Sequence, residues 1–363
     1  PTMPVGAISD LGIVIVEEGE IWRAIEDAER LLLKKKPYTI FQRSNMIVRV
    51  NETITKSMIK KREKSIGLTE VNQAYLTNLL NKELTFVKWM KDGYKQIDPP
   101  PQIAKRYLSM SGEWNLKTLS GLIYSPTLRE DGSVLERTGY DEQSGVYYAN
   151  TSTRFTPIKK DPTREDAEKA LRKLRHPFSE FPFEREEDES VVLAAVLTGL
   201  IRQSIPTAPL FGFTAPTMGS GKTLLANAIA IIVTGKQAVV SPPGKDKEEE
   251  RKALFAKLLQ GKPILLIDNI EWPYYSDVLC GILTAPGETY SDRILGKSEI
   301  VEVPTNITFM ATGNNLSFLG DMTRRSLLCK IVPEMENPEA RKFKIKNLEN
   351  HIRQHRETYV NAG

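Results

Sequence analysis

The chain has 363 residues, which is enough for two or three domains, each with its own hydrophobic core. Hydrophobic residues make up 40% of it, as in ordinary globular proteins, and no apolar run approaches the roughly 20 residues that cross a bilayer. We therefore expect no membrane partner, and a cytoplasmic location. The net charge of +4 permits a nucleic-acid partner without requiring one.

Residues 1–155 are expected to form a small α/β domain. Hydrophobic periodicity and turn residues predict its elements in this order: a helix over 20–36, strands over 38–41 and 46–50, a helix capped by Thr69, a strand over 85–90, a helix over 102–110 and turn-rich β structure over 128–148. This stretch contains no catalytic constellation, so its role stays open.

Residues 156–206 are expected to form a helical linker or collar. Thr163, followed three residues later by Asp166, has the pattern of a capping box at the start of a helix. A strongly apolar helix is predicted over 190–205. Residues 336–363 are expected to form a C-terminal helix, and because the helical pattern runs to the end of the chain, we expect the sequence to be part of a longer protein.

Residues 207–335 have the pattern of a nucleotide-binding core. Five apolar runs alternate with helical segments, and these runs predict strands over 210–214, 238–241, 264–268, 307–312 and 326–332. Apolar strands that alternate with helices favour a parallel sheet covered on both faces. The predicted fold class is therefore α/β, with a five-stranded parallel sheet flanked by helices.

The sequence PTMGSGKT follows the first of these strands and leads into an apolar helix. A strand, a glycine-bearing loop, Lys-Thr and a helix are typical of a loop whose backbone N–H groups bind polyphosphate, so ATP is the expected cofactor. Lys222 would reach the β- and γ-phosphates, and Thr223 would offer its hydroxyl to Mg²⁺. The candidate ATP-binding residues are Pro216, Thr217, Met218, Gly219, Ser220, Gly221, Lys222 and Thr223. Pro216 stands where the pattern has glycine, which makes the start of the loop stiffer.

Asp268 ends the third predicted strand, where sheet topology places it beside the phosphate loop. A carboxylate there would hold Mg²⁺ opposite Thr223. Asn269 follows at the position where hydrolytic relatives of this motif carry Glu. Either Asn269 orients the attacking water or Glu271 does so, and the sequence leaves this choice open.

Polar residues also follow the fourth predicted strand. Asn314, with Asn315 after it, would hydrogen-bond the γ-phosphate and the attacking water. Arg324 and Arg325 come next. Either they pair with nearby acids, or one of them projects into a neighbouring subunit's site as an arginine finger.

Apolar residues alternate on either side of Gly296 and Lys297, which predicts a β-hairpin with a basic tip. Lys297, with Arg293 near the base of the hairpin, would contact a nucleic-acid phosphate backbone. The alternative is a surface hairpin without that role.

The order of these motifs resembles a known family. Residues from about 190 to 335 are similar to the AAA+ ATPase core, specifically to the superfamily 3 and related replicative helicases of phages and plasmids, and more distantly to minichromosome maintenance helicases. The sequences PTLREDGS and TGYDEQSG are similar to the segment before the ATPase in phage and mobile-element primase-helicases. This resemblance implies a homo-oligomer in the form of a hexameric ring, ATP at the subunit interfaces, translocation on single-stranded DNA, and the cytoplasm of a bacterial host. The matching functional positions are Lys222, Thr223, Asp268, Lys297, Asn314, and Arg324 or Arg325.

Three functions are compatible with these residues. The first is an ATP-driven motor that acts on single-stranded or forked DNA. The second is a non-motor AAA+ switch, such as an initiator or loader, whose slow hydrolysis Asn269 would suit. The third is a small-molecule kinase, which leaves the hairpin and the arginine pair unexplained. The polarity of translocation, the subunit number, sequence specificity and the role of the N-terminal domain, whether DNA binding or oligomerisation, stay open.

The cysteines and histidines are not expected to form a metal site. Cys280 and Cys329 lie in apolar surroundings, which predicts buried thiols. His351 and His355 are one helical turn apart and have no third ligand nearby, which predicts a solvated helix face. Mg²⁺ held with the nucleotide is the one metal expected.

Overall fold

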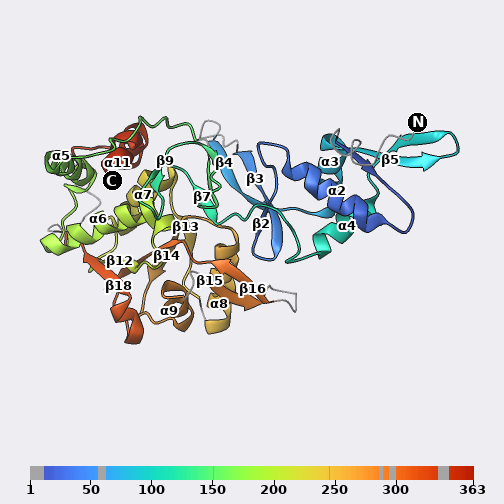
Figure 1. The fold of residues 1–363 in the computed structure, drawn as a ribbon. Coiled ribbons are helices and arrows are strands. Elements are labelled where there is room, and N and C mark those ends of the chain that lie inside the picture. Colours follow the sequence, from blue (N-terminus) through green and yellow to red (C-terminus); the bar gives the residue numbers. More distant parts are fainter. Residues whose placement is uncertain are drawn as a thin grey trace. The chain divides into compact units, whose positions relative to one another are not determined.

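The computed structural model describes residues 12–55, 63–149, 151–244, 246–285, 289–293, 300–333 and 343–363. Contacts within the chain define two compact units, residues 1–119 and residues 120–363, both traced in Figure 1. No helix in the described part of the chain combines the length and the apolar character needed to cross a membrane. The domain boundaries expected from the sequence remain predictions.

The first unit combines helices with two small sheets. Its elements are β1 (Ile13–Ile15), α2 (Ile21–Leu33), β2 (Phe41–Arg43), β3 (Met46–Thr55), β4 (Glu63–Glu70), α3 (Gln73–Glu83), β5 (Thr85–Met90), β6 (Gly93–Ile97) and α4 (Pro101–Ser109). One sheet has the order β1-β5-β6 and the other the order β2-β3-β4. The apolar faces of the three helices meet in one core around Ile25, Leu76 and Ile103.

The expected cap at Thr69 is wrong. Thr69 lies in β4, opposite Arg49 of β3, because the long β3 strand provides backbone partners for that segment. Helix α3 begins at Gln73, and its N-cap is Asn72, whose side chain accepts a hydrogen bond from the Tyr75 N–H at 2.9 Å.

The second unit begins with short strands and ends with short helices. Its elements are β7 (Gly121–Ile123), β8 (Thr127–Leu128), β9 (Val134–Leu135), β10 (Gly139–Tyr140), β11 (Val146–Tyr148), α5 (Arg164–Arg175), η1 (His176–Phe178), α6 (Glu186–Ile201), η2 (Arg202–Ser204), β12 (Leu210–Ala215), α7 (Lys222–Thr234), β13 (Val239–Ser241), α8 (Lys247–Leu259), β14 (Ile264–Ile270), α9 (Asp277–Leu283), β15 (Thr289–Arg293), β16 (Ile300–Pro304), β17 (Thr308–Asn314), η4 (Gly320–Arg324), β18 (Ser326–Lys330), α10 (Leu348–Gln354) and α11 (Arg356–Ala362). The capping box of Thr163 and Asp166 at the start of α5 is confirmed.

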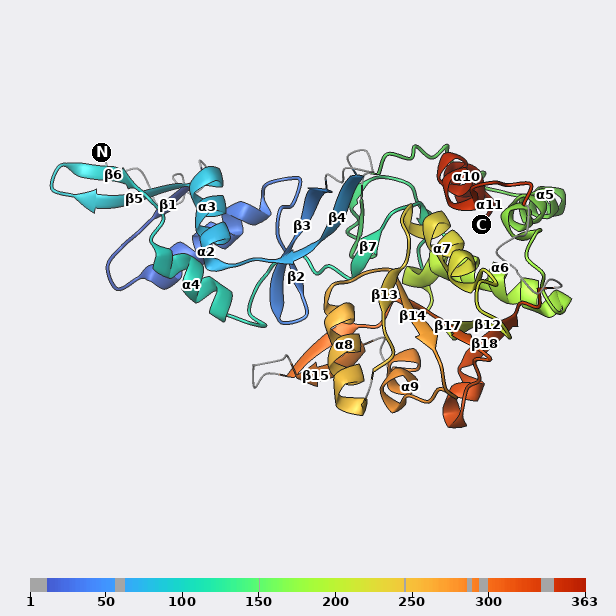
Figure 2. The same ribbon diagram turned by 180° about the vertical axis from the view of Figure 1, so that it is seen from behind.

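The central sheet has five strands in the order β13-β14-β17-β12-β18, and every neighbouring pair is parallel. Alternate side chains of its strands point to opposite faces, so Phe211 packs with α6 and α7 while Leu210 packs with α8 and α9. Figure 2 shows these helices around the sheet. The predicted five-stranded parallel sheet flanked by helices is therefore confirmed, and so are the buried thiols of Cys280 and Cys329.

The C-terminal segment forms two short helices instead of the single helix expected. The chain leaves helical geometry at His355, which lies between α10 and α11. The next residue, Arg356, is buried, and it donates hydrogen bonds to the carbonyl groups of Ile232 and Val233 at the end of α7, at 2.9 and 2.8 Å. Burial lowers the pKa of Arg356 to about 10. This arginine caps α7 and fixes the break after α10 against the core.

Candidate nucleotide site

The phosphate loop lies between the end of β12 and the start of α7. Gly219 and Gly221 have φ angles of 71° and 92°, in the left-handed region that glycine adopts without strain. Gly221 is the N-cap of α7 and has no side chain to bond the first N–H groups of the helix. Those N–H groups and the helix dipole therefore favour an anion at this point. Most of the loop is exposed, including Pro216 and Met218.

Lys222 connects this loop to the next strand of the sheet. Its ammonium donates to the Thr217 carbonyl group at 3.1 Å and to Asn314 Oδ1 at 2.8 Å. Asn314 lies at the end of β17, directly opposite Ala215 in the sheet register. Burial lowers the pKa of Lys222, and the Asp268 carboxylate opposes that shift. The structure thus brings Lys222 and Asn314 together, as expected for residues that share a γ-phosphate.

Asp268 and Thr223 are also side by side. The Thr223 hydroxyl donates to Asp268 Oδ1 at 3.2 Å, and the Thr312 hydroxyl donates to the same oxygen. Carboxylate and hydroxyl oxygens are ligands that suit Mg²⁺, so the donor atoms fit the expected metal. Thr223 and Asp268 would hold it.

Thr312 was not identified from the sequence, although it holds Asp268 in place. It is buried in β17 and also accepts a hydrogen bond from the Asn269 N–H at 3.2 Å. The available signal was its spacing: Thr312 and Asn314 are two residues apart, so they share one face of the strand. A pair of polar residues two positions apart at the end of an apolar strand, as in β17, was therefore the pattern that could have indicated this site.

The two candidates for positioning water are bonded to each other. The Asn269 side-chain N–H donates to Glu271 Oε1 at 3.0 Å, and both side chains are exposed. Asn269 has φ 63°, and the register of β14 against β17 shifts between Ile267 and Ile270. Asn tolerates this left-handed geometry better than most residues do, so the strand irregularity explains its presence. Asn315, the residue after Asn314, also has a positive φ, of 49°, and its side chain is exposed.

The adjacent arginines have different surroundings. Arg325 is half-buried and donates to the Cys280 carbonyl group, to Thr284 Oγ1 at 2.7 Å and to Asp321 Oδ2 at 3.2 Å. Arg324 is exposed and makes no ion pair with another described residue. The side chain of Arg325 is therefore held by groups of its own chain, whereas that of Arg324 is exposed.

The expected hairpin is present as two antiparallel strands, β15 and β16, which pair from Thr289 opposite Pro304 to Arg293 opposite Ile300. Arg293 is exposed at the end of β15. Lys297 lies outside the described residues, so its expected DNA contact remains a prediction from the sequence. Among the described residues, no hydrogen bond or ion pair joins Arg293 to the phosphate loop.

An aromatic side chain next to the loop was also missed. A Cβ atom at Gly221 would lie 3.4 Å from Cε1 of Phe181, so this half-buried ring flanks the phosphate loop. The ring stacks on Phe183, with 6.1 Å between centroids. The Val332 N–H donates to the Pro182 carbonyl group at 2.8 Å, which anchors the aromatic segment beside the sheet. The aromatic-rich sequence FSEFPFE was the signal.

Comparison with known proteins gives distant likenesses. No family model and no curated protein matches the sequence. Among solved structures, the chain is similar to the C-terminal region of NrS-1 in its apo A form, with 13% identity, a TM-score of 0.37, and coverage of 80% of this chain and 69% of that one. It is also similar to the JCV helicase, with 15% identity, a TM-score of 0.34, and coverage of 55% of this chain and 53% of that one. Because TM-scores this low carry no functional assignment, the function has to be argued from the site's own side chains.

Proposed function

We propose that this chain is an ATP-hydrolysing motor that moves on single-stranded DNA and separates the strands of forked DNA. The observation that carries the proposal is the convergence of Lys222, Thr223, Asp268 and Asn314 at one edge of the central sheet. Asp268 and Asn314 come from the ends of the adjacent parallel strands β14 and β17, and Lys222 and Thr223 come from the first turn of α7. The carboxyl ends of parallel strands are where ligands bind in such sheets.

Each of these residues has a role in phosphoryl transfer. The first N–H groups of α7 and the ammonium of Lys222 bind the β- and γ-phosphates, which replace the internal partners of that ammonium. Mg²⁺ held by Thr223 and Asp268 supplies charge neutralisation at those phosphates. Asn314 orients the γ-phosphate and the attacking water. Asn269 and Glu271 act as one unit, in which the amide holds the carboxylate toward water.

The adenine base would lie against Phe181. This ring flanks Gly221, the N-cap of α7 and a residue of the phosphate loop. Stacking on an aromatic ring stabilises a base by about 1–3 kcal/mol. Phe181 therefore contributes affinity for the nucleoside while the loop contributes affinity for the phosphates.

The active assembly is proposed to be a homo-oligomeric ring, hexameric by its resemblance to replicative helicases. Arg324 is exposed beside the edge strand β18, so it can reach a γ-phosphate bound by a neighbouring subunit. The basic hairpin would contact DNA through Arg293 and Lys297. The proposed location is the cytoplasm of a bacterial host, in a phage, prophage or plasmid replication system.

A second function, the slow AAA+ switch, is favoured by one observation. The Asn269 amide cannot accept a proton from water, and it donates a hydrogen bond to the Glu271 carboxylate, the other candidate for that role. If this bond persists with nucleotide present, hydrolysis will be slow and ATP will act as a conformational signal.

A strand-displacement assay on forked DNA, run with an ATPase assay, separates the two functions. A motor separates the strands with ATP and hydrolyses ATP faster when single-stranded DNA is added. Lys297→Ala should then leave the basal rate of ATP hydrolysis near wild type. It should also reduce, by about one unit, the slope of the logarithm of the DNA-binding constant against the logarithm of the salt concentration. Lys252→Ala on α8, which removes an exposed lysine paired with Glu248, is the matched control. ATP binding without strand separation or DNA stimulation would contradict the motor and favour the switch.

A further inference from the structure

The three histidines of the chain line a single cavity in the second unit. The cavity has a volume of about 540 Å³ and lies between α5, η1 and the two C-terminal helices. His176 follows α5, whereas His351 and His355 come from residues far along the chain. Figure 1 shows α5 beside α11, although these helices are separated by most of the second unit's sequence. The expected solvated face at His351 and His355 is therefore only half right, because His351 is half-buried within this cavity.

The histidine rings are close to one another. The ring centroids of His176 and His351 are 5.8 Å apart, and those of His351 and His355 are 4.6 Å apart. His351 Nε2 lies 2.9 Å from the Tyr359 hydroxyl. Burial lowers the pKa of His351, and charge on His355 and His176 lowers it further. The three rings therefore form one cluster with His351 in the middle.

The other charged residues that line the cavity are Lys169, Arg172 and Lys173, all from α5. Lys169 pairs with Glu165 at 2.6 Å, one turn back on the same helix. Arg172 and Lys173 are exposed and form no ion pair with any other described residue. The cavity thus has cationic side chains and no carboxylate in its lining.

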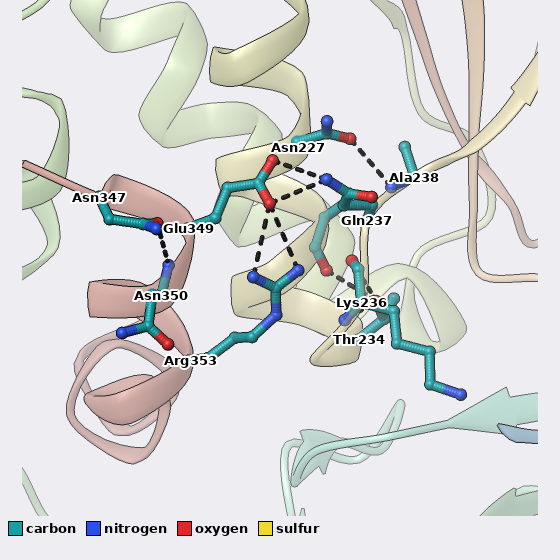
Figure 3. A network of polar contacts seen from close by, with 10 residues as sticks. Asn227, Thr234, Lys236, Gln237, Ala238, Asn347, Glu349, Asn350 and Arg353 are labelled. Atoms are coloured by element: carbon teal, nitrogen blue, oxygen red, sulfur yellow. Dashed lines mark hydrogen bonds and ion pairs between the residues drawn. The ribbon is translucent and has the colours of Figure 1, made fainter. Parts of the chain in front are cut away.

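The carboxylates of the surrounding elements are engaged elsewhere. On α10, Glu349 accepts hydrogen bonds from the Gln237 side chain at 2.8 Å and from Arg353 at 3.4 Å, as Figure 3 shows. On α11, Glu357 accepts from the Thr156 N–H at 3.0 Å. Three further acids pair with other partners: Glu168 of α5 with Arg164, Asp166 of α5 with Lys159, and Glu189 of α6 with Arg175. Arg172 and Lys173 thus have no acidic ion-pair partner among the described residues.

We propose that this cavity is a second anion site that binds a phosphate group between the histidines and the α5 cations. Arg172 and Lys173 supply fixed charge, and the imidazoles donate N–H groups once they are protonated. The phosphate comes either from a nucleic-acid backbone or from a free polyphosphate. A metal does not fit here, because the described residues contain no group of three or more His, Cys, Asp and Glu placed to hold one.

Proton uptake makes the site sensitive to pH. A phosphate near the rings raises the pKa of His351, so binding adds a proton there and the affinity rises as the pH falls. For each proton taken up, the affinity increases by up to about tenfold per pH unit. The site therefore binds most tightly below the ordinary histidine range and weakens above it.

The experiment measures pyrophosphate binding by calorimetry in a Lys222→Ala background, which weakens the phosphate loop as a competing site. We expect one remaining site whose affinity is at least about tenfold higher at pH 6 than at pH 8. Arg172→Ala and His355→Gln each remove an exposed side chain from the cavity and should weaken binding by about tenfold. Arg154→Ala, which removes an exposed arginine outside the cavity lining, should leave the affinity unchanged.

Two further measurements identify the source of the phosphate. A labelled oligothymidylate that binds with the same pH dependence and is displaced by pyrophosphate assigns the site to a nucleic-acid backbone. Binding of pyrophosphate alone assigns it to a free polyphosphate. The proposal is overturned if the Lys222→Ala protein binds neither probe, or if binding is the same with and without Arg172 and His355. Neither result bears on the motor, since ATP hydrolysis is measured separately in the protein with Lys222 intact.

Discussion

The nucleotide site and the histidine cavity are assembled in opposite ways. The nucleotide site lies at the ends of neighbouring parallel strands, and its polar groups are already paired: Lys222 with Asn314, and Thr223 with Asp268. The histidine cavity lies between helices from distant parts of the sequence, and Arg172 and Lys173 have no acidic partner among the described residues. A site whose groups hold one another is preorganised for chemistry, whereas a site with uncompensated charge depends on its ligand.

The largest effects are expected at the phosphate loop. Lys222→Ala removes the charge that is proposed to contact the phosphates, and Asp268→Ala removes the proposed Mg²⁺ ligand, so each should reduce ATP hydrolysis by about 10³-fold or more. Phosphate release under saturating ATP measures this. Lys252→Ala, which removes an exposed lysine of α8 that pairs with Glu248, should keep wild-type turnover. Wild-type hydrolysis in either of the first two variants would place the active site elsewhere.

Replacing Arg324 should change ATP hydrolysis, whereas replacing Arg325 should change stability. Arg324→Ala should retain ATP binding and lose about 10³-fold in hydrolysis, because the lost group is proposed to act on a neighbouring subunit's nucleotide. Mixing this variant with Lys222→Ala should recover some turnover at shared interfaces. Arg325→Ala should instead lower the melting temperature, since it removes bonds to Cys280 and Thr284 within one subunit. If no mixture recovers turnover, Arg324 does not act in trans.

Thr312 tests whether preorganisation contributes to the nucleotide site. Thr312→Val removes the hydroxyl that holds Asp268 and should raise the Mg²⁺ concentration for half-maximal hydrolysis by about tenfold. Thr312→Ser keeps the hydroxyl and should restore the wild-type Mg²⁺ dependence. A merely structural role would lower stability in both variants without changing that dependence.

Phe181 separates base binding from phosphate binding. Phe181→Ala should weaken ATP binding by about tenfold through lost stacking and leave tripolyphosphate binding unchanged. Phe183→Ala, which removes the ring stacked on Phe181, is the comparison variant and should have a smaller effect on ATP. Equal losses for ATP and tripolyphosphate would mean that Phe181 only supports the loop.

The smallest effect is a pH dependence of stability at the histidine cavity. The pKa of His351 is lowered in the folded protein, so the unfolded chain binds the proton more tightly. This contribution to stability is complete above the ordinary histidine pKa of about 6.5 and is lost as the pH falls below that value, through the lower pKa of the folded state. In phosphate-free buffer, the melting temperature of wild type should fall more steeply from pH 7.5 to pH 5.5 than that of His351→Asn. If the melting temperatures of the two proteins fall equally with pH, the folded structure does not lower the pKa of His351.

The sequence by itself determined the central sheet and the phosphate loop. Apolar runs of strand length, separated by helical periodicity, are local signals, and each of the five predicted strands overlaps one strand of the parallel sheet. The loop residues are contiguous, so Gly219, Gly221 and Lys222 could be assigned from spacing alone. Asp268 and Asn314 could be added because parallel strands end at one edge.

Tertiary structure decided what local patterns do not encode. Thr69 has the residue type of a helix cap, but pairing of β4 with β3 placed it in a strand. The sequence alone does not distinguish the roles of the adjacent residues Arg324 and Arg325. The structure shows that Arg325 donates a hydrogen bond to the Cys280 carbonyl group of α9. Thr312, Phe181 and the meeting of His176 with His351 depend on contacts between distant segments. The free energy that stabilises such contacts comes from burial and hydrogen bonding across the whole unit. A short window of sequence therefore does not predict them.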